Sequence, residues 1–276
     1  MIKKVYDVKK SKEIIILKLG GGLITDKNKP FSLREEVIEN SVHQIIRSKK
    51  KVIVIHGGGS FGHPTAQEYQ INKGKDPSIA NQIYGLTKTH DVMVKLNSII
   101  IEKFLKQNVA SLSIQTSSIF VKDSSKDLFS CNFEPIIRCL SLGIIPVIYG
   151  DIVFDLQGDF SILSGDKIIL LLCQYLKEFF ISKVIFAVEV EGIFIYNKDM
   201  DIIELAEEIK CSKLDSLPLA NLDKKIDVTG GIKGKLDNIH SICKLGIPVQ
   251  LINGKDEEKI YKCLINKEVK GTSITI

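Results

Sequence analysis

The chain has 276 residues, of which 44% are hydrophobic and 26% are charged, as in ordinary globular proteins. Its formal net charge of +5 comes from lysine, because only Arg34, Arg47 and Arg138 are arginines. Proteins that read nucleic acid depend on bidentate arginine contacts, so we expect no nucleic-acid partner.

The cysteines and the apolar runs indicate the compartment. The six cysteines form no Cys-x-x-Cys pair, so we expect free thiols in a reducing cytoplasm rather than disulfides or a zinc site. The first apolar run, Ile14–Leu19, is too short for the core of a signal peptide. A longer run, Ile168–Val188, is interrupted by charged residues. We therefore expect a cytoplasmic protein with no membrane partner.

Short β-branched runs alternate with helical patterns along the whole chain, which predicts an α/β fold with a mainly parallel sheet covered on both faces. The strands, each expected to be buried on both faces, are Ile14–Leu19, Val52–His56, Val109–Ile114, Ile144–Tyr149, Lys183–Val188 and Pro248–Ile252. Helices are expected from a capping box at Ser32 to about Ser48, from about Pro64, and over Ser78–Lys106, Ser164–Phe179 and Gly231–Lys244. A hairpin pairs Asp151–Asp155 with Phe160–Leu163.

The first predicted strand ends in Lys18-Leu-Gly20-Gly21-Gly22, and Thr25-Asp26-Lys27 follows. The glycines allow a backbone to approach a phosphate closely. Lys18 stands within an apolar strand, where an unpaired charge is costly, so we expect it to have a partner or a ligand.

The second predicted strand leads into His56-Gly57-Gly58-Gly59-Ser60-Phe61-Gly62-His63. Three consecutive glycines after a strand can bring N–H groups together as an anion nest, and His63 adds a side-chain donor. This stretch therefore predicts a phosphate site.

Two acidic segments follow. Gly150-Asp151 comes at the end of a strand, where ligands bind in parallel sheets, although the pair by itself also fits a β-turn. Ser164-Gly165-Asp166 opens an apolar helix, where Asp166 either interacts with the positive end of the helix or orients lysines or a metal ion beside phosphates.

The segment Thr229-Gly230-Gly231-Ile232-Lys233-Gly234-Lys235 leads into the last long helix. A double glycine at a helix N-terminus offers N–H groups to phosphate, and Lys235 can reach back over them. Two lysines in the first turn oppose the helix dipole, which is understandable if an anion binds there. The chain lacks both the Walker phosphate loop and the protein-kinase catalytic loop.

These glycine and lysine segments, in this order, resemble the amino-acid kinase superfamily over nearly the whole chain outside residues 1–13. Within it the chain is similar to the isopentenyl phosphate kinase family, because Gly62-His63-Pro64 is generally missing from relatives that phosphorylate carboxylates or UMP. The resemblance implies one three-layer αβα domain over residues 1–276, with an acceptor half at about 14–160 and a nucleotide half at about 161–276. It also implies a homodimer that uses ATP and Mg²⁺, with no protein ligand assigned to the metal.

The resemblance also implies roles for individual residues. Catalysis is assigned to Lys18, Lys27, His63, Asp166 and Lys235, with Lys27 stabilising the transferring phosphoryl group and Asp166 positioning the other two lysines. Acceptor phosphate binding is assigned to Gly57, Gly62, His63, Gly150 and Asp151. ATP binding is assigned to Lys18, Gly20, Gly21, Gly58, Asp166, Glu189, Gly230, Gly231 and Lys235.

Relatives often have Thr-Asp-x-Asp-Gly where this chain has Val188-Glu-Val-Glu-Gly192, next to the expected nucleotide base. Candidates for an apolar slot around the isoprenoid tail are Tyr69, Ile83, Tyr84 and Leu86, although a place in the hydrophobic core is the favoured interpretation for each of them. Two alternatives remain open: a kinase of the same fold with another phosphate or phosphonate acceptor, and a nucleotide sensor without catalysis.

Overall fold

The computed structural model describes residues 12–26, 28–197, 202–218 and 229–276. They form an eight-stranded sheet in the order β12-β14-β13-β9-β1-β2-β6-β3. Neighbouring strands are parallel except β13 and β14, so β12 and β14 run opposite to the other six. The strands are β1 (Glu13–Leu19), β2 (Val52–His56), β3 (Ser111–Ile114), β6 (Ile145–Tyr149), β9 (Phe180–Val188), β12 (Glu208–Lys210), β13 (Val249–Asn253) and β14 (Thr272–Thr275).

Successive residues of the central strands enter two different cores. In β1, Ile14 and Ile16 belong to one hydrophobic cluster, whereas Ile15 and Leu17 belong to the other. This is the period of two expected when a strand is covered on both faces. The same alternation places Lys18 on the face of Ile14 and Ile16.

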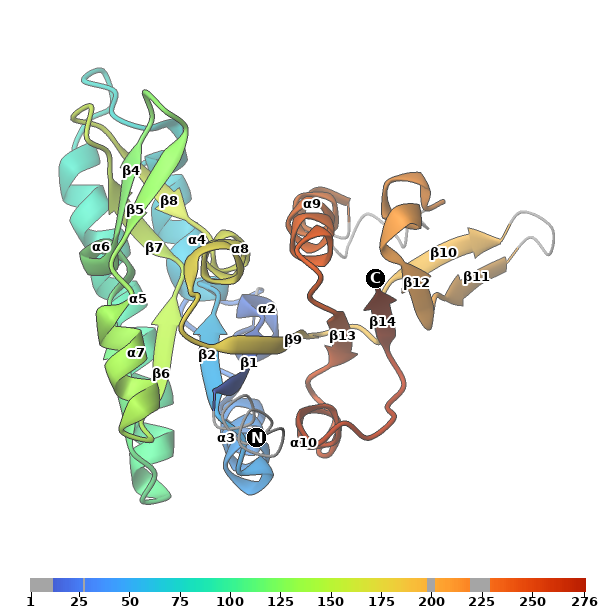
Figure 1. The fold of residues 1–276 in the computed structure, drawn as a ribbon. Coiled ribbons are helices and arrows are strands. Elements are labelled where there is room, and N and C mark those ends of the chain that lie inside the picture. Colours follow the sequence, from blue (N-terminus) through green and yellow to red (C-terminus); the bar gives the residue numbers. More distant parts are fainter. Residues whose placement is uncertain (1–11, 27, 198–201, 219–228) are drawn as a thin grey trace.

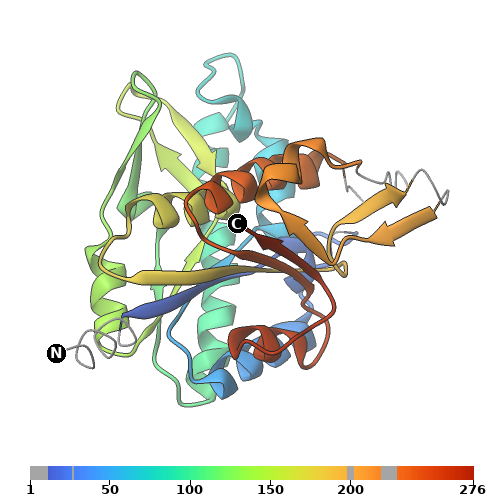
Figure 2. The same cartoon turned by 45° about the vertical axis from the view of Figure 1, so that its right-hand side comes forward.

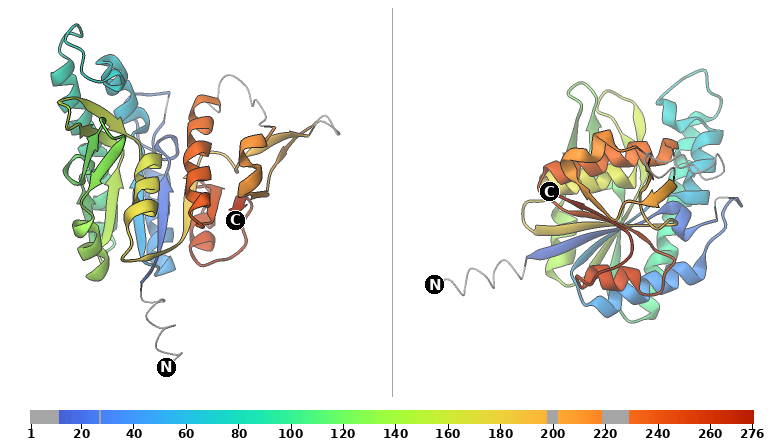
Figure 3. Two further views of the ribbon diagram at one scale, coloured as in Figure 1. Left: turned by 45° about the horizontal axis from the view of Figure 1, so that its top comes forward. Right: turned by 90° about the vertical axis from the view of Figure 1, so that its right-hand side faces the viewer.

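Helices cover both faces, which gives three layers (Figure 1, Figure 3). The face of Ile14 and Ile16 packs against α7 (Glu134–Ser141), α8 (Gly165–Tyr175) and α9 (Thr229–Lys244). The opposite face packs against α3 (Glu35–Ser48), α5 (Gln82–Lys106) and α10 (Lys259–Leu264). The predicted α/β fold with a mainly parallel sheet, and its αβα layering, are therefore confirmed.

Short elements surround the sheet. The single turn α2 (Gly21–Ile24) and the helix α4 (Gly59–Glu68) follow β1 and β2, and α6 (Thr116–Ile119) follows β3. Antiparallel hairpins are β4 (Phe120–Asp123) with β5 (Leu128–Cys131), β7 (Asp151–Phe154) with β8 (Phe160–Leu163), and β10 (Phe194–Asn197) with β11 (Ile202–Leu205). Figure 2 shows β10 and β11 projecting on the side opposite the β4–β5 hairpin. Two 3₁₀ turns are η1 (Ile71–Lys73) and η2 (Cys211–Ser216).

The strand predictions hold except at the sheet edge. The hairpin at β7–β8 is confirmed, but β3 is half exposed rather than buried on both faces because it is the last strand of the sheet. No helix in the described part of the chain has the length and apolar character needed to cross a membrane. The six cysteines are free thiols, as expected.

Three predicted helix starts are wrong, one of them at Ser78, since α5 begins at Gln82. The capping box at Ser32 does not form, and α3 begins at Glu35 after Arg34, with no side-chain cap. Ser32 instead exchanges hydrogen bonds with Ser60, which holds it outside the helix. The helix expected from about Pro64 begins at Gly59, so Gly59 and Gly62 are helical rather than part of a loop.

Candidate active site

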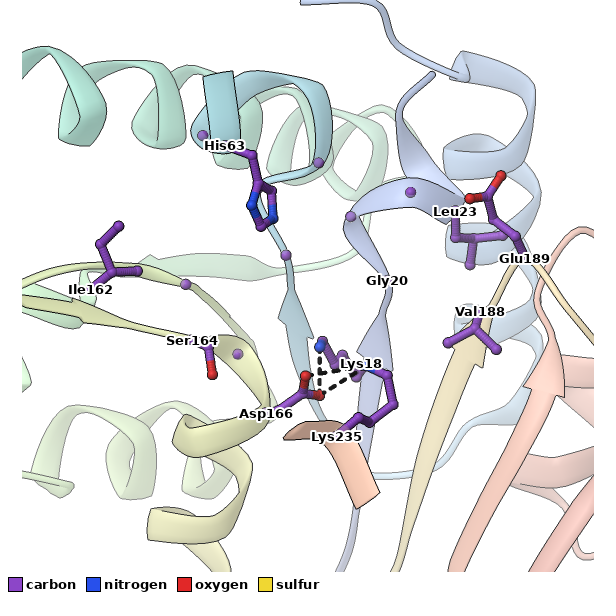
Figure 4. Close-up of a pocket in the computed structure, with 18 of the residues that line it drawn as sticks. Lys18, Gly20, Leu23, His63, Ile162, Ser164, Asp166, Val188, Glu189 and Lys235 are labelled. Carbon is purple, nitrogen blue, oxygen red and sulfur yellow. Dashed lines mark hydrogen bonds and ion pairs between the residues drawn. The ribbon is translucent and has the colours of Figure 1, made fainter. Parts of the chain in front are cut away.

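A cavity of about 360 Å³ lies at the carboxyl ends of β1, β2 and β6 (Figure 4). Parallel α/β sheets bind ligands at this end of their strands. The residues that line it include most of the predicted site: Lys18, Gly20, Gly21, Gly57, Gly58, Gly62, His63, Gly150, Asp151, Asp166, Glu189 and Lys235. Segments that are far apart in the sequence thus meet in one place.

One carboxylate holds two lysines at the floor of the cavity. Lys18 Nζ donates to Asp166 Oδ1 at 2.5 Å, and Lys235 Nζ donates to Asp166 Oδ2 at 3.1 Å. Asp166 is in the first turn of α8, where the positive end of the helix favours a carboxylate, and Ser164 caps that helix by accepting from the Lys167 N–H. The expectation that Lys18 has a partner is confirmed.

Burial sets the ionisation of this cluster. Desolvation lowers the pKa of Lys18 to about 8, although the Asp166 carboxylate acts in the other direction. Burial by itself would raise the pKa of Asp166, but Lys18 and Lys235 outweigh it and hold that pKa below its ordinary value. The Phe186 ring lies 5.9 Å from Lys18 Nζ and 5.6 Å from Lys235 Nζ, which adds cation–π attraction. The cluster therefore presents two lysine donors around one ionised carboxylate, a setting suited to a polyanion.

The glycine segments after β1 and β2 pack backbone against backbone. A Cβ on Gly21 would lie 2.3 Å from the Gly59 nitrogen, and one on Gly57 would lie 2.9 Å from the Gly21 nitrogen. The Gly57 N–H donates to the Leu19 carbonyl, and the Gly150 N–H donates to the His56 carbonyl. Both amides extend the hydrogen bonding of the sheet and do not point to an anion. The missing side chain at Gly57 instead lets the segment after β2 approach the segment after β1 closely.

His63 projects from α4 into the cavity, opposite the lysine cluster (Figure 4). Ile162 lies on one side of the cavity, whereas Leu23, Val188 and Glu189 lie on the other (Figure 4). The cavity thus has the lysine cluster at its floor and His63 at the opposite end, with Ile162 on one side between them.

Asp151 reaches the cavity with its backbone, because its side chain is fully buried. Its Oδ2 lies 2.6 Å from His90 Nδ1, while Oδ1 has no hydrogen-bond partner among the residues that the structure describes. Burial raises the pKa of Asp151, and the hydrogen bond to Asp151 raises the pKa of His90. No local pattern points to His90, because it lies 61 positions from Asp151 in the chain.

A second contact from α5 supports the same end of the sheet. Asn97 Nδ2 lies 3.1 Å from His56 Nε2, and His56 Nδ1 lies 3.1 Å from the Gly57 carbonyl. This pattern requires the proton on Nδ1, so that Nε2 accepts from the amide. Desolvation lowers the pKa of His56 to about 4, so the imidazole is neutral and holds the residue before the glycines in place.

Some predicted residues are not described or are placed differently. Lys27 lies outside the described residues, and Gly230 and Gly231 fall in the first turn of α9, for which the structure gives no contacts. The tail-slot candidates Tyr69, Ile83, Tyr84 and Leu86 do not line the cavity, and Tyr69 and Leu86 pack in a small core, as the alternative interpretation expects. Helices α4 and α5 do contribute to the lining, but through Ala66, Thr89 and Met93.

The described residues contain no group of three His, Cys, Asp or Glu side chains that could hold a metal ion. Both oxygens of Asp166 are occupied by lysines. Mg²⁺ retains several waters and commonly binds through substrate phosphates, so this site fits a magnesium ion carried by a nucleotide rather than one held in a protein cage.

Comparisons with known proteins agree with this geometry. The sequence pattern of the amino acid kinase family matches residues 13–253. The isopentenyl phosphate kinase of Methanocaldococcus jannaschii is 36% identical over 271 residues, covering 95% of this chain and 98% of the relative. That of Methanothermobacter thermautotrophicus is 30% identical, covering 95% and 99%.

Solved structures of isopentenyl phosphate kinases also resemble this chain. A crystal structure of an isopentenyl phosphate kinase superimposes with a TM-score of 0.79 at 28% identity, covering 95% of this chain and all of the other. The product complex of the Thermoplasma acidophilum enzyme gives 0.75 at 28% identity, with coverage of 95% and 99%. The UMP kinase of Ureaplasma parvum, at 14% identity and a TM-score of 0.63, shares the fold.

Proposed function

The chain belongs to the amino acid kinase family, and on that premise we propose that it transfers the γ-phosphoryl group of ATP to isopentenyl phosphate, forming isopentenyl diphosphate and ADP. The observation that carries the proposal is one cavity with the Lys18–Asp166–Lys235 cluster at its floor and His63 facing it. The two groups lie at opposite ends of one cavity, as an acceptor phosphate and the ATP phosphates would require.

The chemistry asks for positioning and charge neutralisation more than for covalent help. An oxygen of the acceptor phosphate attacks the γ-phosphorus, and the bond from that phosphorus to the β–γ bridging oxygen breaks. A phosphate is already a competent nucleophile at neutral pH, so no side chain needs to remove a proton. Lys18 and Lys235 stabilise the charge that develops on the phosphate oxygens, and Asp166 keeps the two lysines together.

His63 binds and orients the acceptor phosphate in this scheme. It comes from the short helix α4, whose start is fixed by Gly59 against Gly21, the first residue of α2. A small misplacement of the acceptor is costly, because transfer requires the attacking oxygen to lie in line with the leaving group. We include Lys27 as a further cation for the transferring group on the basis of the resemblance alone.

Mg²⁺ would be held through the nucleotide phosphates and water, where it neutralises charge on the β- and γ-oxygens. Lys18 and Lys235, which both contact Asp166, supply the positive charge that the protein itself brings to the phosphates. We assign the ATP phosphates to this floor and to Gly20, Gly21, Gly58, Gly230 and Gly231, and the nucleoside to the side of Val188 and Glu189.

The apolar tail fits the other side of the cavity. Ala66, Met93 and Ile162 line it there, next to His63. Hydrocarbon buried against these side chains contributes about 0.8 kcal/mol for each methylene group. We propose that the half at about 14–160 provides most of the acceptor contacts and the half at about 161–276 most of the contacts to the nucleoside.

We also propose a homodimer in the cytoplasm. Among the described residues β3 pairs only with β6, and its Leu112 is 48% exposed; a second copy would cover this edge of the sheet. Size-exclusion chromatography with light scattering measures the mass; a monomer at micromolar concentration contradicts the dimer. The six free thiols suit a reducing compartment.

The test is a panel of acceptors with labelled ATP and Mg²⁺. Isopentenyl phosphate should give a kcat/KM at least tenfold above that of nucleoside monophosphates and phosphonates. His63→Ala should lower kcat/KM for the acceptor by about 100-fold while ATP affinity stays the same. His43→Ala, at an exposed histidine of α3, serves as the matched control. A His63→Ala enzyme with unchanged acceptor kinetics would refute the role of His63.

A further inference from the structure

Arg34 contacts two segments that border the nucleotide side of the cavity. It stands just before α3, where its backbone N–H donates to the Ile24 carbonyl at 2.9 Å. Its Nη1 donates both to the Gly22 carbonyl, at 2.5 Å, and to the Glu189 carboxylate. One residue thus connects α2, which follows β1, with the segment that follows β9.

Arg34 donates hydrogen bonds to carbonyl groups at the C-terminal end of α2. A single helical turn has no internal partners for most of its carbonyls. The Gly20 carbonyl accepts from the Leu23 and Ile24 N–H groups, and the Gly21 carbonyl accepts from Thr25. Arg34 supplies the donors for Gly22 and Ile24. A cation at this end of a helix is also favourable electrostatically.

The two acidic residues after β9, Glu189 and Glu191, both form ion pairs. Glu189 lines the cavity, and its Oε1 lies 3.3 Å from Lys255 Nζ in addition to its contact with Arg34. Glu191 accepts from Asn253 and from Lys259. An aspartate in place of Glu189 would be shorter by one C–C bond of about 1.5 Å, so the contact with Arg34 depends on the longer side chain.

We propose that Arg34 is a positioning residue for the nucleotide: through Gly22 and Glu189 it fixes the glycine turn α2 relative to the segment Val188–Gly192, and so sets the width of the nucleotide side of the cavity. The inference rests on the proposed function in taking ATP as the ligand of that side. Arg34 itself does not line the cavity, and it acts through the two segments that do.

The chain provides a matched control at the other end of the same helix. Arg47, in the last turn of α3, donates to Glu258 at 2.7 Å and lies over the Tyr261 ring. It therefore also ties α3 to the C-terminal part of the chain, but neither it nor its partners line the cavity. If ATP binding depended only on the attachment of α3 to the C-terminal part of the chain, replacing either Arg34 or Arg47 should weaken it.

The experiment compares Arg34→Ala, Glu189→Ala, the double variant and Arg47→Ala. ATP affinity is measured by calorimetry without acceptor, and KM is then measured for ATP and for isopentenyl phosphate. Loss of one hydrogen-bonded charge pair should weaken ATP binding about tenfold in Arg34→Ala and in Glu189→Ala. The double variant should be weakened by less than the product of the two single effects, because both single variants remove the Arg34–Glu189 contact. Arg47→Ala should bind ATP as the wild type does.

A comparison of KM for ATP with KM for the acceptor distinguishes a positioning role of Arg34 from a general loss of structure. KM for ATP should rise in Arg34→Ala while KM for the acceptor changes less than twofold, and Arg34→Lys should recover part of the ATP affinity because it restores one donor. Unchanged ATP affinity in Arg34→Ala, or an equal loss in Arg47→Ala, would overturn the inference. Because calorimetry needs no acceptor, an enzyme that binds ATP in this pattern but does not phosphorylate isopentenyl phosphate would refute the proposed function alone.

Discussion

Asp166→Asn tests the lysine cluster that the proposed chemistry depends on. Both lysine nitrogens contact Asp166 Oδ1, at 2.5 and 3.4 Å, so they are at most about 6 Å apart. At an effective dielectric constant of about 20, two positive charges at that distance repel by about 3 kcal/mol. Without the carboxylate, one lysine gives up its proton or moves away. We therefore expect kcat/KM for ATP to fall by about 100-fold.

The pH dependence provides a second measurement on the same variant. The protonated lysine is the active form, and burial already lowers the pKa of Lys18 to about 8. Activity of the wild type should therefore fall as the pH rises through about 8. In Asp166→Asn the carboxylate no longer helps to hold that proton, so the fall should begin at a lower pH.

The assay is transfer from labelled ATP, measured at several pH values. Asp237→Asn, on the exposed side of α9, makes the same change in charge and should behave as the wild type. A value of kcat/KM within threefold of the wild type, with an unchanged pH profile, would refute the role given to Asp166.

Three further predictions concern the supports of the cavity. Gly21→Ala should lower the free energy of unfolding by about 2 kcal/mol in urea denaturation and abolish transfer, because its Cβ would lie 2.3 Å from the Gly59 nitrogen. Gly234→Ala, where the described residues leave open space, should be harmless. Equal stability and activity of the two variants would contradict the backbone contact at Gly21. His56 has a folded pKa of about 4, below its ordinary 6.5, so it binds fewer protons when folded and its contribution to stability is lost as the pH falls from 6.5 to 4. The wild type should lose about 3 kcal/mol more over that range than His56→Gln, and parallel stability curves would speak against a buried neutral imidazole. His90→Ala should cost about 3 kcal/mol by leaving the Asp151 carboxylate buried without a partner, and adding Asp151→Asn should recover most of it; no recovery would show that the loss comes from packing.

Much of the fold follows from local patterns. Runs of β-branched residues give the central strands because each buried residue on them meets one of two cores. The position of Lys18 within such a run predicts a partner, and the period of two explains why that partner, Asp166, comes from α8, which covers the same face of the sheet. The place of Asp166 at a helix start makes it a candidate, and its contact with two lysines is what the family resemblance implies.

Other features depend on contacts that no local pattern contains. Ile83 and Tyr84 were tail-slot candidates, but α5 turns them to solvent, and Leu86 packs in a small separate core with Ile152 and Phe160. The rotation of a helix around its axis is set by the packing of all its residues, so composition alone could not place the slot.

The pairings His90–Asp151 and Arg34–Glu189 join residues 61 and 155 positions apart. The sequence shows the charged residues but not which of them meet. The start of α3 was also misplaced, because Ser32 finds its partner in Ser60, on α4, instead of capping its own helix. Tertiary contacts outweigh a local capping signal in this case.

The most direct measurement is the identity of the product. The purified chain is incubated with ATP, Mg²⁺ and isopentenyl phosphate, and the mixture is followed by phosphorus NMR and mass spectrometry. We expect isopentenyl diphosphate and ADP to appear in equal amounts, with His63→Ala forming neither at a comparable rate. Unchanged isopentenyl phosphate, from an enzyme that binds ATP and phosphorylates another acceptor in the panel, would contradict the proposed function.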